Sequence, residues 1–311
     1  MKTVVVGPGA VGCLFASFFA SAGEDVWLLD KSPDRARQIA EKGVHVEGIG
    51  GQRDIPVNAT ADTAEIGKVD LVLICVKAFD THAAAESVKP ILNNETVVMT
   101  LQNGYGNVER ISEAVGEKHA LGGTTAQGAT LLGVGHIRHA GNGETTIGEI
   151  NGSMTDRLKN LRTLFEKCGI ATKLTDNLDG LIWSKLVINV GINALTAIAR
   201  LRNGKLVEYE GTRDVLRDAV EEAVAVASKD GVKLLFDDPV GKVEDVCRAT
   251  AANVASMFQD VLRKKSTEVD FINGAVVRRA EELGMSVPVN LTLTRLVKTI
   301  QESYSDQVDN I

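Results

Sequence analysis

Short runs of β-branched and other apolar residues alternate with helix-forming stretches through the first half of the chain. Each run has the length and near-continuous apolar character of a strand buried on both faces of a parallel sheet. The predicted strands occupy residues 2–6, 25–29, 70–76, 95–101 and 170–174. Helices are predicted at residues 13–22 and 155–168, and the glycine-rich segment 120–148 predicts a hairpin. This alternation is typical of an α/β domain with a parallel sheet.

Past residue 174 the strand signals stop and only the helical pattern remains. The predicted helices occupy residues 182–201, 212–230, 240–249, 252–264, 267–283 and 289–303. The 311 residues are enough for two domains of ordinary size. We therefore expect an α/β domain over residues 1–174, followed by an all-helical domain over residues 175–311.

The segment from Ile182 to Leu201 is apolar on almost every side, which predicts a helix buried within the second domain. One polar line crosses it, because Lys185, Asn189 and Asn193 repeat at every fourth position and share a helix face. A narrow solvated stripe or a satisfied polar network in the core are the alternatives. An ordinary solvated face is wider and richer in charge, and an unpaired buried ammonium is costly. We therefore favour the lining of a cleft that binds a small polar ligand.

The loop after the first strand has the G-x-G-x-x-G spacing. Its residues are Gly7, Pro8, Gly9, Ala10, Val11 and Gly12. A strand precedes it, a helix follows, and Asp30 closes the next strand about twenty positions on. The first glycine makes a tight turn, the second lets a pyrophosphate approach the backbone, and the third lets helix and strand pack closely. The phosphates then lie at a helix N-terminus, so the loop predicts a dinucleotide site of the Rossmann type.

The residues after the second strand bear on which dinucleotide binds. Asp30 is placed to accept hydrogen bonds from the ribose hydroxyls, which favours NADH. The basic and hydroxyl side chains of Lys31, Ser32 and Arg35 are suited to hold a 2′-phosphate, which favours NADPH. These residues by themselves leave both cofactors open.

Two further polar residues, Lys77 and Asn103, follow later predicted strands. Ligands bind at the carboxyl ends of strands in open α/β sheets, so both residues are candidate contacts to a cofactor or substrate. An exposed lysine and a turn-forming Asn-Gly are the alternatives. We expect His136 and His139, on the predicted hairpin, to be structural or exposed rather than catalytic.

Composition narrows the function classes. A formal net charge of −7 argues against a protein that relies on attraction to nucleic-acid phosphates.

The four cysteines lie far apart without metal-ligand spacing, and we expect Cys13 and Cys75 to be buried thiols. The first strand begins at Lys2, which leaves no room for a signal peptide, and we find no apolar run long enough to span a bilayer. We therefore expect a cytoplasmic protein with neither a nucleic-acid nor a membrane partner.

Several short motifs, spread in order along the whole chain, belong together. They are Gly7 to Gly12, Val76-Lys77-Ala78, Leu101-Gln102-Asn103-Gly104, Trp183-Ser184-Lys185-Leu186 with Asn189 and Asn193, Arg202-Asn203-Gly204, and Ser256 with Glu268 to Gly274. In this order they resemble the ketopantoate reductase (2-dehydropantoate 2-reductase) family. The resemblance implies an N-terminal Rossmann domain, an all-helical C-terminal domain, and an active site in the cleft between them.

The resemblance also implies roles for individual residues. Lys185 would be the catalytic acid, and Asn103 would contact both cofactor and substrate. The other substrate contacts would be Asn189, Asn193, Asn203 and Ser256. Lys77, Ala129 and Glu268 would line the cofactor side. From the sequence alone, Glu268 is either a first-turn residue that complements a helix dipole or the partner of a buried lysine.

The family commonly uses NADPH, held by a basic residue after the second strand. Lys31 occupies the position of that basic residue. Asp30, however, stands where the family usually has a small residue, so NADH remains an alternative cofactor. The expected reaction is the reduction of ketopantoate to pantoate, a step of pantothenate and coenzyme A biosynthesis.

Two other functions compete with this one. An NAD-dependent D-2-hydroxyacid dehydrogenase would reduce a different branched 2-oxo acid on the same architecture. A non-catalytic NAD(P) sensor would need the glycine loop but would have no use for the line of Lys185, Asn189 and Asn193. The exposed helical faces of the second half favour a homodimer.

Overall fold

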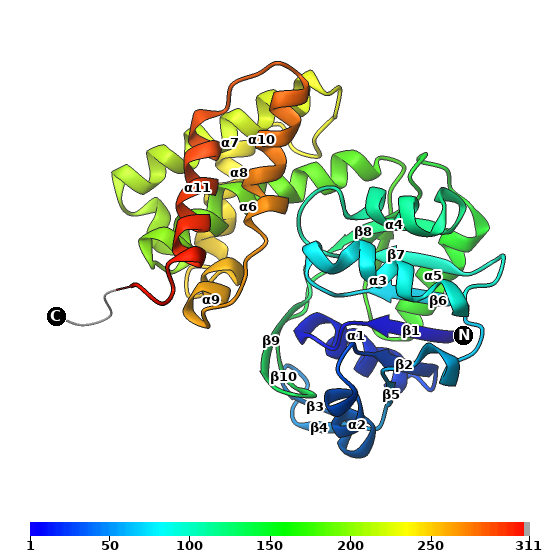
Figure 1. The fold of residues 1–311 in the computed structure, drawn as a ribbon. Coiled ribbons are helices and arrows are strands. Elements are labelled where there is room, and N and C mark those ends of the chain that lie inside the picture. Colours follow the sequence, from blue (N-terminus) through cyan, green and yellow to red (C-terminus); the bar gives the residue numbers. More distant parts are fainter. Residues whose placement is uncertain (308–311) are drawn as a thin grey trace. The chain divides into compact units, whose positions relative to one another are not determined.

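The computed structural model describes residues 1–307, and they form two compact units (Figure 1). Unit 1 consists of Met1–Gln102 and Asn107–Leu178, and unit 2 consists of Asn103–Gly106 with the chain from Asp179 onward. The predicted boundary after residue 174 falls just before the point at which the chain enters unit 2. Asn103–Gly106 packs with unit 2 although it lies far from that boundary in the sequence.

Unit 1 is built on an eight-stranded sheet with the order β12-β11-β8-β7-β6-β1-β2-β5. The strands are β1 (Lys2–Val6), β2 (Asp25–Leu29), β5 (Asn58–Thr60), β6 (Leu71–Ile74), β7 (Val97–Thr100), β8 (Ala120–Thr125), β11 (Thr145–Gly148) and β12 (Thr172–Leu174). All neighbours are parallel except β8 and β11, which are antiparallel. The strand order reverses at β1, which is where ligands bind in open α/β sheets.

Five α-helices accompany this sheet. They are α1 (Ala10–Ser21), α2 (Pro33–Lys42), α3 (Thr81–Ser87), α4 (Asn107–Val115) and α5 (Asp156–Lys167). The α/β architecture is confirmed, and β1 and β2 have the predicted bounds. The predicted strands at 70–76 and 95–101 are shorter at both ends in the structure, where paired residues occupy 71–74 and 97–100.

A second, four-stranded sheet in unit 1 has the order β4-β3-β10-β9. Its strands are β3 (Val44–Gly48), β4 (Arg53–Ile55), β9 (Gly128–Gly133) and β10 (His136–Gly141). The antiparallel pair of β9 and β10 confirms the predicted hairpin, whereas the parallel pairing of β3 with β10 was not predicted. Helix α1 contacts β3, β9 and β10, so its apolar side chains serve both sheets.

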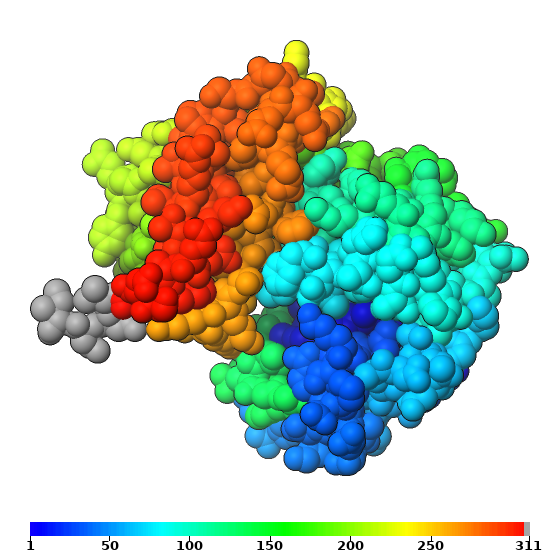
Figure 2. All heavy atoms as spheres, in the orientation of Figure 1, coloured from blue at the N-terminus to red at the C-terminus, as the bar shows by residue number. Residues whose placement is uncertain are grey.

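Among its described residues, unit 2 holds helices and no strand, as predicted. Its helices are α6 (Leu178–Ala199), α7 (Glu210–Lys229), α8 (Pro239–Ala249), α9 (Ser256–Leu262), α10 (Asn273–Glu282) and α11 (Pro288–Glu302), with the 3₁₀ turns η5 (Asn203–Val207) and η6 (Val269–Phe271). Apolar side chains of α6, including Trp183, Val187 and Val190, are completely buried in the core of this unit. Figure 2 shows α10 and α11, coloured orange and red, packed side by side along one face.

Two predictions about helices in this half are corrected. The predicted helix at 267–283 is broken, because Ile272 leaves the helical region at φ −111° and ψ −95° and separates η6 from α10. The predicted helix at 252–264 is reduced to α9.

The expectation about membrane-length segments is also wrong. Among the described helices, α6 is long and apolar enough to cross a membrane by length and composition. However, 72% of its most apolar window is buried inside the protein. This burial is what a core helix shows, and it is consistent with the prediction that the segment is enclosed on nearly every side.

Candidate active site

The glycine loop of unit 1 has the backbone geometry that the motif predicts. Gly7 has φ +93°, and a Cβ there would lie 2.9 Å from the backbone nitrogen of Val76. A Cβ on Gly12 would lie 2.1 Å from the carbonyl oxygen of Gly7, so α1 approaches the loop too closely for any side chain. Beside Gly9, in contrast, no described atom lies within 4 Å of a built Cβ. Packing therefore requires the first and third glycines, and the second glycine borders open space.

That open space lies at the N-terminus of α1, because Gly9 is the N-cap of the helix. Gly9 provides no side-chain cap, and the first turn holds no acidic residue. The first N–H groups of the helix therefore lack intrahelical partners and favour a negatively charged group. The loop fits the pyrophosphate of a dinucleotide.

Asp30 follows β2 and is 97% buried, and only one of its two carboxylate oxygens accepts hydrogen bonds. Its Oδ1 accepts hydrogen bonds from the Ser32 backbone N–H at 3.0 Å and from Arg35 Nη2 at 2.6 Å. Its Oδ2 is buried and has no hydrogen-bond partner among the described residues. A buried carboxylate oxygen without a donor is costly, and a ribose hydroxyl would satisfy it.

Lys31 and Arg35, the two basic candidates for binding a 2′-phosphate, differ in their ion-pair partners. The Arg35 guanidinium is bound to Asp30, whereas Lys31 is 78% exposed and pairs with Asp80 at 3.2 Å. An exposed ion pair of this kind is weak, so Lys31 can exchange its partner for a phosphate at little cost. Lys31 is therefore the better candidate for a 2′-phosphate.

The remaining cofactor candidates of unit 1 are half-buried. Lys77 caps the 3₁₀ turn η2 (Ala78–Asp80), which follows β6. Ala129 lies on β9 opposite His139 of β10. His139 is 96% buried and its Nε2 lies 3.1 Å from the side-chain oxygen of Gln127, so its role is structural, as expected.

The Cys13 thiol borders the glycine loop, because its Sγ lies 3.5 Å from the Pro8 carbonyl oxygen. All four thiols are free, and Cys13 is completely buried, as predicted. Burial, with a smaller contribution from Asp30, raises the pKa of the Cys13 thiol to about 12. Cys75 is only partly buried as a residue, yet burial of its thiol also raises the pKa of that group. Neither is poised as a nucleophile.

In unit 2, α6 carries the polar line of Lys185, Asn189 and Asn193. Lys185 and Asn189 are partly buried, and Asn193 is 96% buried. Burial lowers the pKa of Lys185 from 10.5 to about 8, and the negative charge of Glu268 opposes this shift. Some surface of the residue stays accessible, but the protein surrounds the ammonium closely enough to disfavour its charge. Lys185 is therefore a cation at neutral pH that gives up its proton readily.

Both asparagines of this line lack hydrogen bonds that they need. The Nδ2 atoms of Asn189 and Asn193 are buried and have no hydrogen-bond partner among the described residues. The unsatisfied amides argue against a satisfied core network, and the burial of Asn193 and of both amide nitrogens argues against a solvated stripe. Amide donors left in this state are typical of a site completed by a polar ligand.

Asn203, another predicted substrate contact, is the first residue of η5 in unit 2. Its Nδ2 donates to Thr250 Oγ1 at 2.9 Å, and its backbone N–H donates to the Asn253 carbonyl at 3.1 Å. Its Oδ1 is buried without a hydrogen-bond partner among the described residues. Ser256 is the first residue of α9 and is exposed, so it is the least enclosed of the predicted substrate contacts.

Asn103 reaches unit 2 because the turn that follows it packs there. The Tyr105 backbone N–H donates to the Phe271 carbonyl at 2.9 Å, and the Tyr105 ring lies 5.2 Å from that of Trp183. Gly104 has φ +91°, and a Cβ there would lie 2.6 Å from the Phe271 carbonyl oxygen. The Asn-Gly turn is thus required by packing, and it places Asn103 in the same unit as Lys185.

Two buried polar atoms of unit 2 had no predicted role. Trp183 Nε1 on α6 and Asn273 Oδ1 on α10 are buried without a hydrogen-bond partner among the described residues. The Asn273 amide nitrogen donates to Asn290 at 3.0 Å. Both residues lie within the motifs that the sequence singled out, but only burial identifies the unsatisfied atoms.

A surface pocket lined by residues of α7 and α8, among them Arg213 and Glu244, contains none of the predicted site residues.

Replacing Asn193 or Asn189 with alanine is expected to raise the KM for the substrate about 10–100-fold. A hydrogen bond to a charged group contributes about 1.5–3 kcal/mol. The free energy of unfolding should change little, because the amide nitrogens make no hydrogen bond in the protein that the substitution would remove. Steady-state kinetics and urea unfolding of each variant measure the two quantities.

Asn290→Ala is the matched control. Asn290 is completely buried, and its Nδ2 donates to the Ala219 carbonyl at 2.9 Å and to Glu222 at 2.8 Å. Its loss should lower the free energy of unfolding by about 1–3 kcal/mol and leave the KM unchanged. The reverse pattern, with Asn193→Ala unfolding easily at an unchanged KM, would assign Asn193 to the structure.

A glycine-loop sheet of this topology, joined to a helical unit with a lysine among buried asparagines, defines an oxidoreductase that uses a nicotinamide dinucleotide. The family model "Ketopantoate reductase PanE/ApbA" matches residues 3–152, and the model of its C-terminal part matches residues 177–301. The chain belongs to the ketopantoate reductase family.

Relatives along the full length support this assignment. A 2-dehydropantoate 2-reductase of Halobacterium salinarum is 37% identical over 97% of this chain and 99% of its own length. The enzyme of the same name from Vibrio cholerae is 35% identical over 98% of this chain and 99% of its own length.

Solved structures also support the assignment to this fold and family. A PanE/ApbA family ketopantoate reductase from Ralstonia eutropha JMP134 has a TM-score of 0.91 at 35% identity and covers 98% of this chain and 100% of its own. D-mandelate dehydrogenase with NADH and anilino(oxo)acetate has a TM-score of 0.90 at 24% identity, with 98% and 100% covered, which is a likeness of fold.

Proposed function

We propose that this protein reduces 2-dehydropantoate (ketopantoate) to pantoate with NADPH, a step of pantothenate biosynthesis. The observation that supports it best is the line on α6. A lysine whose ammonium is partly desolvated is followed at four-residue intervals by two buried, unsatisfied amide donors. Such donors suit the carboxylate and hydroxyl oxygens of a 2-oxo acid. The chain's membership of the ketopantoate reductase family favours ketopantoate among such acids.

Unit 1 would hold the dinucleotide, and unit 2, which includes Asn103, would hold the substrate. In unit 1 the backbone around Gly9 would bind the pyrophosphate, and Asp30 Oδ2 would accept a ribose hydroxyl. Lys31 would bind the 2′-phosphate, and Lys77 and Ala129 would line the cofactor site. The bound cofactor supplies hydride to the ketone carbon of the substrate.

The residues of unit 2 would bind the substrate and provide the proton. The Lys185 ammonium stabilises the negative charge that develops on the ketone oxygen and then donates a proton to it. Asn103, Asn189, Asn193, Asn203 and Ser256 would fix the substrate by hydrogen bonds. Glu268 opposes the effect of burial on Lys185 and so keeps the acid protonated at neutral pH.

The activity test is a steady-state assay of NADPH and NADH oxidation with ketopantoate and with a panel of other branched 2-oxo acids. We expect the highest kcat/KM for ketopantoate with NADPH. A higher value for another acid with NADH would instead favour the D-2-hydroxyacid dehydrogenase alternative. Binding of a dinucleotide without turnover of any acid would favour the sensor.

Lys31→Ala is expected to raise the KM for NADPH about 10-fold or more and to leave the KM for NADH nearly unchanged. Only NADPH carries the 2′-phosphate, and charge-assisted hydrogen bonds to phosphate are among the stronger ones. Lys42→Ala, which removes an exposed lysine from the last turn of α2, is the control. Equal effects of Lys31→Ala on the two cofactors would remove Lys31 from the phosphate site.

The rate of reduction is expected to fall as the pH rises through about 8, because deprotonated Lys185 cannot act as the acid. Glu268→Gln should move this fall to lower pH, since the carboxylate raises the pKa of Lys185. Glu281→Gln, at an exposed position of α10, should leave the profile unchanged. The measurement is kcat/KM against pH for the three proteins. A profile that Glu268→Gln does not move would contradict the electrostatic role.

Two expectations stay predictions. Cytoplasmic location accords with the small-molecule substrate and with the free thiols of the described chain. A homodimer is expected from the exposed helical faces of unit 2, and sedimentation equilibrium tests it.

A further inference from the structure

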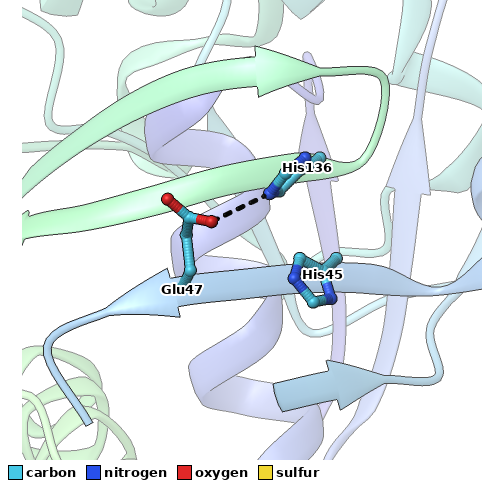
Figure 3. A group of neighbouring side chains, drawn as sticks. All are labelled: His45, Glu47 and His136. Carbon is cyan, nitrogen blue, oxygen red and sulfur yellow. Dashed lines mark ion pairs between the residues drawn. The ribbon is translucent and has the colours of Figure 1, made fainter. Parts of the chain in front are cut away.

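The second sheet of unit 1 brings two histidines and a glutamate together on one face. His45 of β3 and His136 of β10 are direct partners in the parallel register, and their rings lie 4.7 Å apart, edge to face. Glu47 is two residues beyond His45 on β3, so its side chain points to the same face of the sheet. Figure 3 shows His45 and Glu47 on one strand and His136 on the neighbouring strand, with Glu47 and His136 pointing toward each other.

These side chains are spaced as metal ligands are. One ligand atom from each of His45, Glu47 and His136 lies within 4.8 Å of the other two. His136 Nε2 is buried and forms an ion pair with Glu47 Oε2 at 3.5 Å, but it makes no hydrogen bond to the described residues (Figure 3). This separation is longer than an ordinary hydrogen bond, and a metal ion bound by both atoms would satisfy the imidazole nitrogen. All three residues are partly buried, which leaves a path for an ion from solvent.

Neighbouring residues orient two of the three side chains. Asp54 on β4 accepts a hydrogen bond from His45 Nδ1 at 2.6 Å, which fixes the ring and leaves its lone pair on the other nitrogen. Arg138 on β10 donates to Glu47 Oε1 at 2.5 and 2.6 Å and leaves Oε2 available. Carboxylates behind histidine ligands and hydrogen bonds to ligating carboxylates are the usual outer partners of metal sites.

We propose that His45, Glu47 and His136 form a binding site for a divalent transition-metal ion of the zinc type. Two imidazoles and one carboxylate suit Zn²⁺, whereas Mg²⁺ and Ca²⁺ prefer oxygen ligands throughout. Three protein ligands leave a coordination position for water. The positive charge of Arg138 weakens the attraction for a cation, and the negative charge of Asp54 offsets it.

An ion in this site would join β3 to β10. The two strands lie far apart in sequence, since Glu47 and Arg138 are separated by 91 residues. A ligand that binds only the folded arrangement stabilises it, so Zn²⁺ should raise the melting temperature. The site makes no use of the glycine loop or of Lys185, so it is independent of the proposed reductase function.

The test is calorimetric titration of chelator-treated, full-length protein with ZnCl₂ at pH 7.5, together with thermal melts. We expect one high-affinity ion per chain, a higher Tm with Zn²⁺, and no displacement by a large excess of MgCl₂. His45→Ala and His136→Ala should each weaken binding by more than about 10-fold, and Asp54→Asn by about 10-fold.

His82→Ala is the matched control, because His82 is exposed on α3 of the same unit and lies outside the site. It should bind Zn²⁺ like the unaltered protein. Melts in EDTA establish that every variant folds, which is expected because the replaced side chains are partly exposed. Equal Zn²⁺ binding by the unaltered protein and by the His45→Ala/His136→Ala double variant would overturn the proposal. Displacement by Mg²⁺ would overturn it as well.

Discussion

Lys185→Met is expected to lower kcat about 10²–10⁴-fold and, at the same time, to raise the free energy of unfolding at pH 7. The loss of turnover follows from removing the general acid, whose typical contribution has this size. The gain in stability follows from burial, which lowers the pKa of Lys185 in the folded protein from 10.5 to about 8. A charged lysine is thus less stable in the folded chain than in the unfolded one.

The sign of the stability change follows from proton binding. Between about pH 8 and 10.5 the unfolded chain binds more protons at Lys185 than the folded chain, so stability rises with pH across that window. Below about pH 8 the folded protein bears the full penalty of the charged group. Methionine is neutral and of similar length, so it removes this penalty, and the expected gain is about 1–3 kcal/mol.

Two measurements test this prediction, single-turnover rates and urea unfolding at pH 7, and Lys242→Met is the control for both. Lys242 is exposed on α8, so its replacement should change neither quantity appreciably. A Lys185→Met protein that turns over at a near-normal rate would exclude Lys185 as the acid. A less stable one would mean that the ammonium is held by structural contacts stronger than its desolvation.

Gly9→Ala and Gly12→Ala are expected to fail in different ways. A Cβ on Gly9 meets no described atom within 4 Å, and Gly9 has φ −74°, which alanine adopts readily. The Gly9→Ala protein should therefore fold with a loss of less than about 1 kcal/mol, which is the cost of a poorer N-cap. It should nevertheless bind NADPH at least about 10-fold more weakly, because the added methyl occupies the space that the pyrophosphate needs.

Gly12→Ala should instead destabilise unit 1. The added Cβ would lie 2.1 Å from the Gly7 carbonyl oxygen and 3.3 Å from Cys75 Cβ, so α1 must move away from the sheet. We expect a loss of about 1–3 kcal/mol, as for other overpacked positions. Thermal melts and dinucleotide titrations of both variants separate the two effects. Normal NADPH affinity in Gly9→Ala would show that the open space beside Gly9 is not the phosphate site.

The sequence determined the features that depend on local pattern. Short, mostly apolar runs predicted β1 and β2 to the residue, and the spacing of glycines predicted the turn at Gly7 and the close approach at Gly12. The four-residue repeat on α6 predicted which polar side chains share a face. These signals are local because each depends on the geometry of a single strand, turn or helix.

Only the tertiary structure decided which distant residues meet. No pattern in β3 or β10 indicates that they pair, and the cluster of His45, Glu47 and His136 exists only because they do. The break at Ile272 and the packing of Asn103–Gly106 with unit 2 also depend on contacts with distant segments. Whether a polar atom is satisfied, as for the amides of Asn189 and Asn193, depends on everything packed around it. The sequence names such groups, but it does not contain the distances between segments that decide their hydrogen bonds and charge.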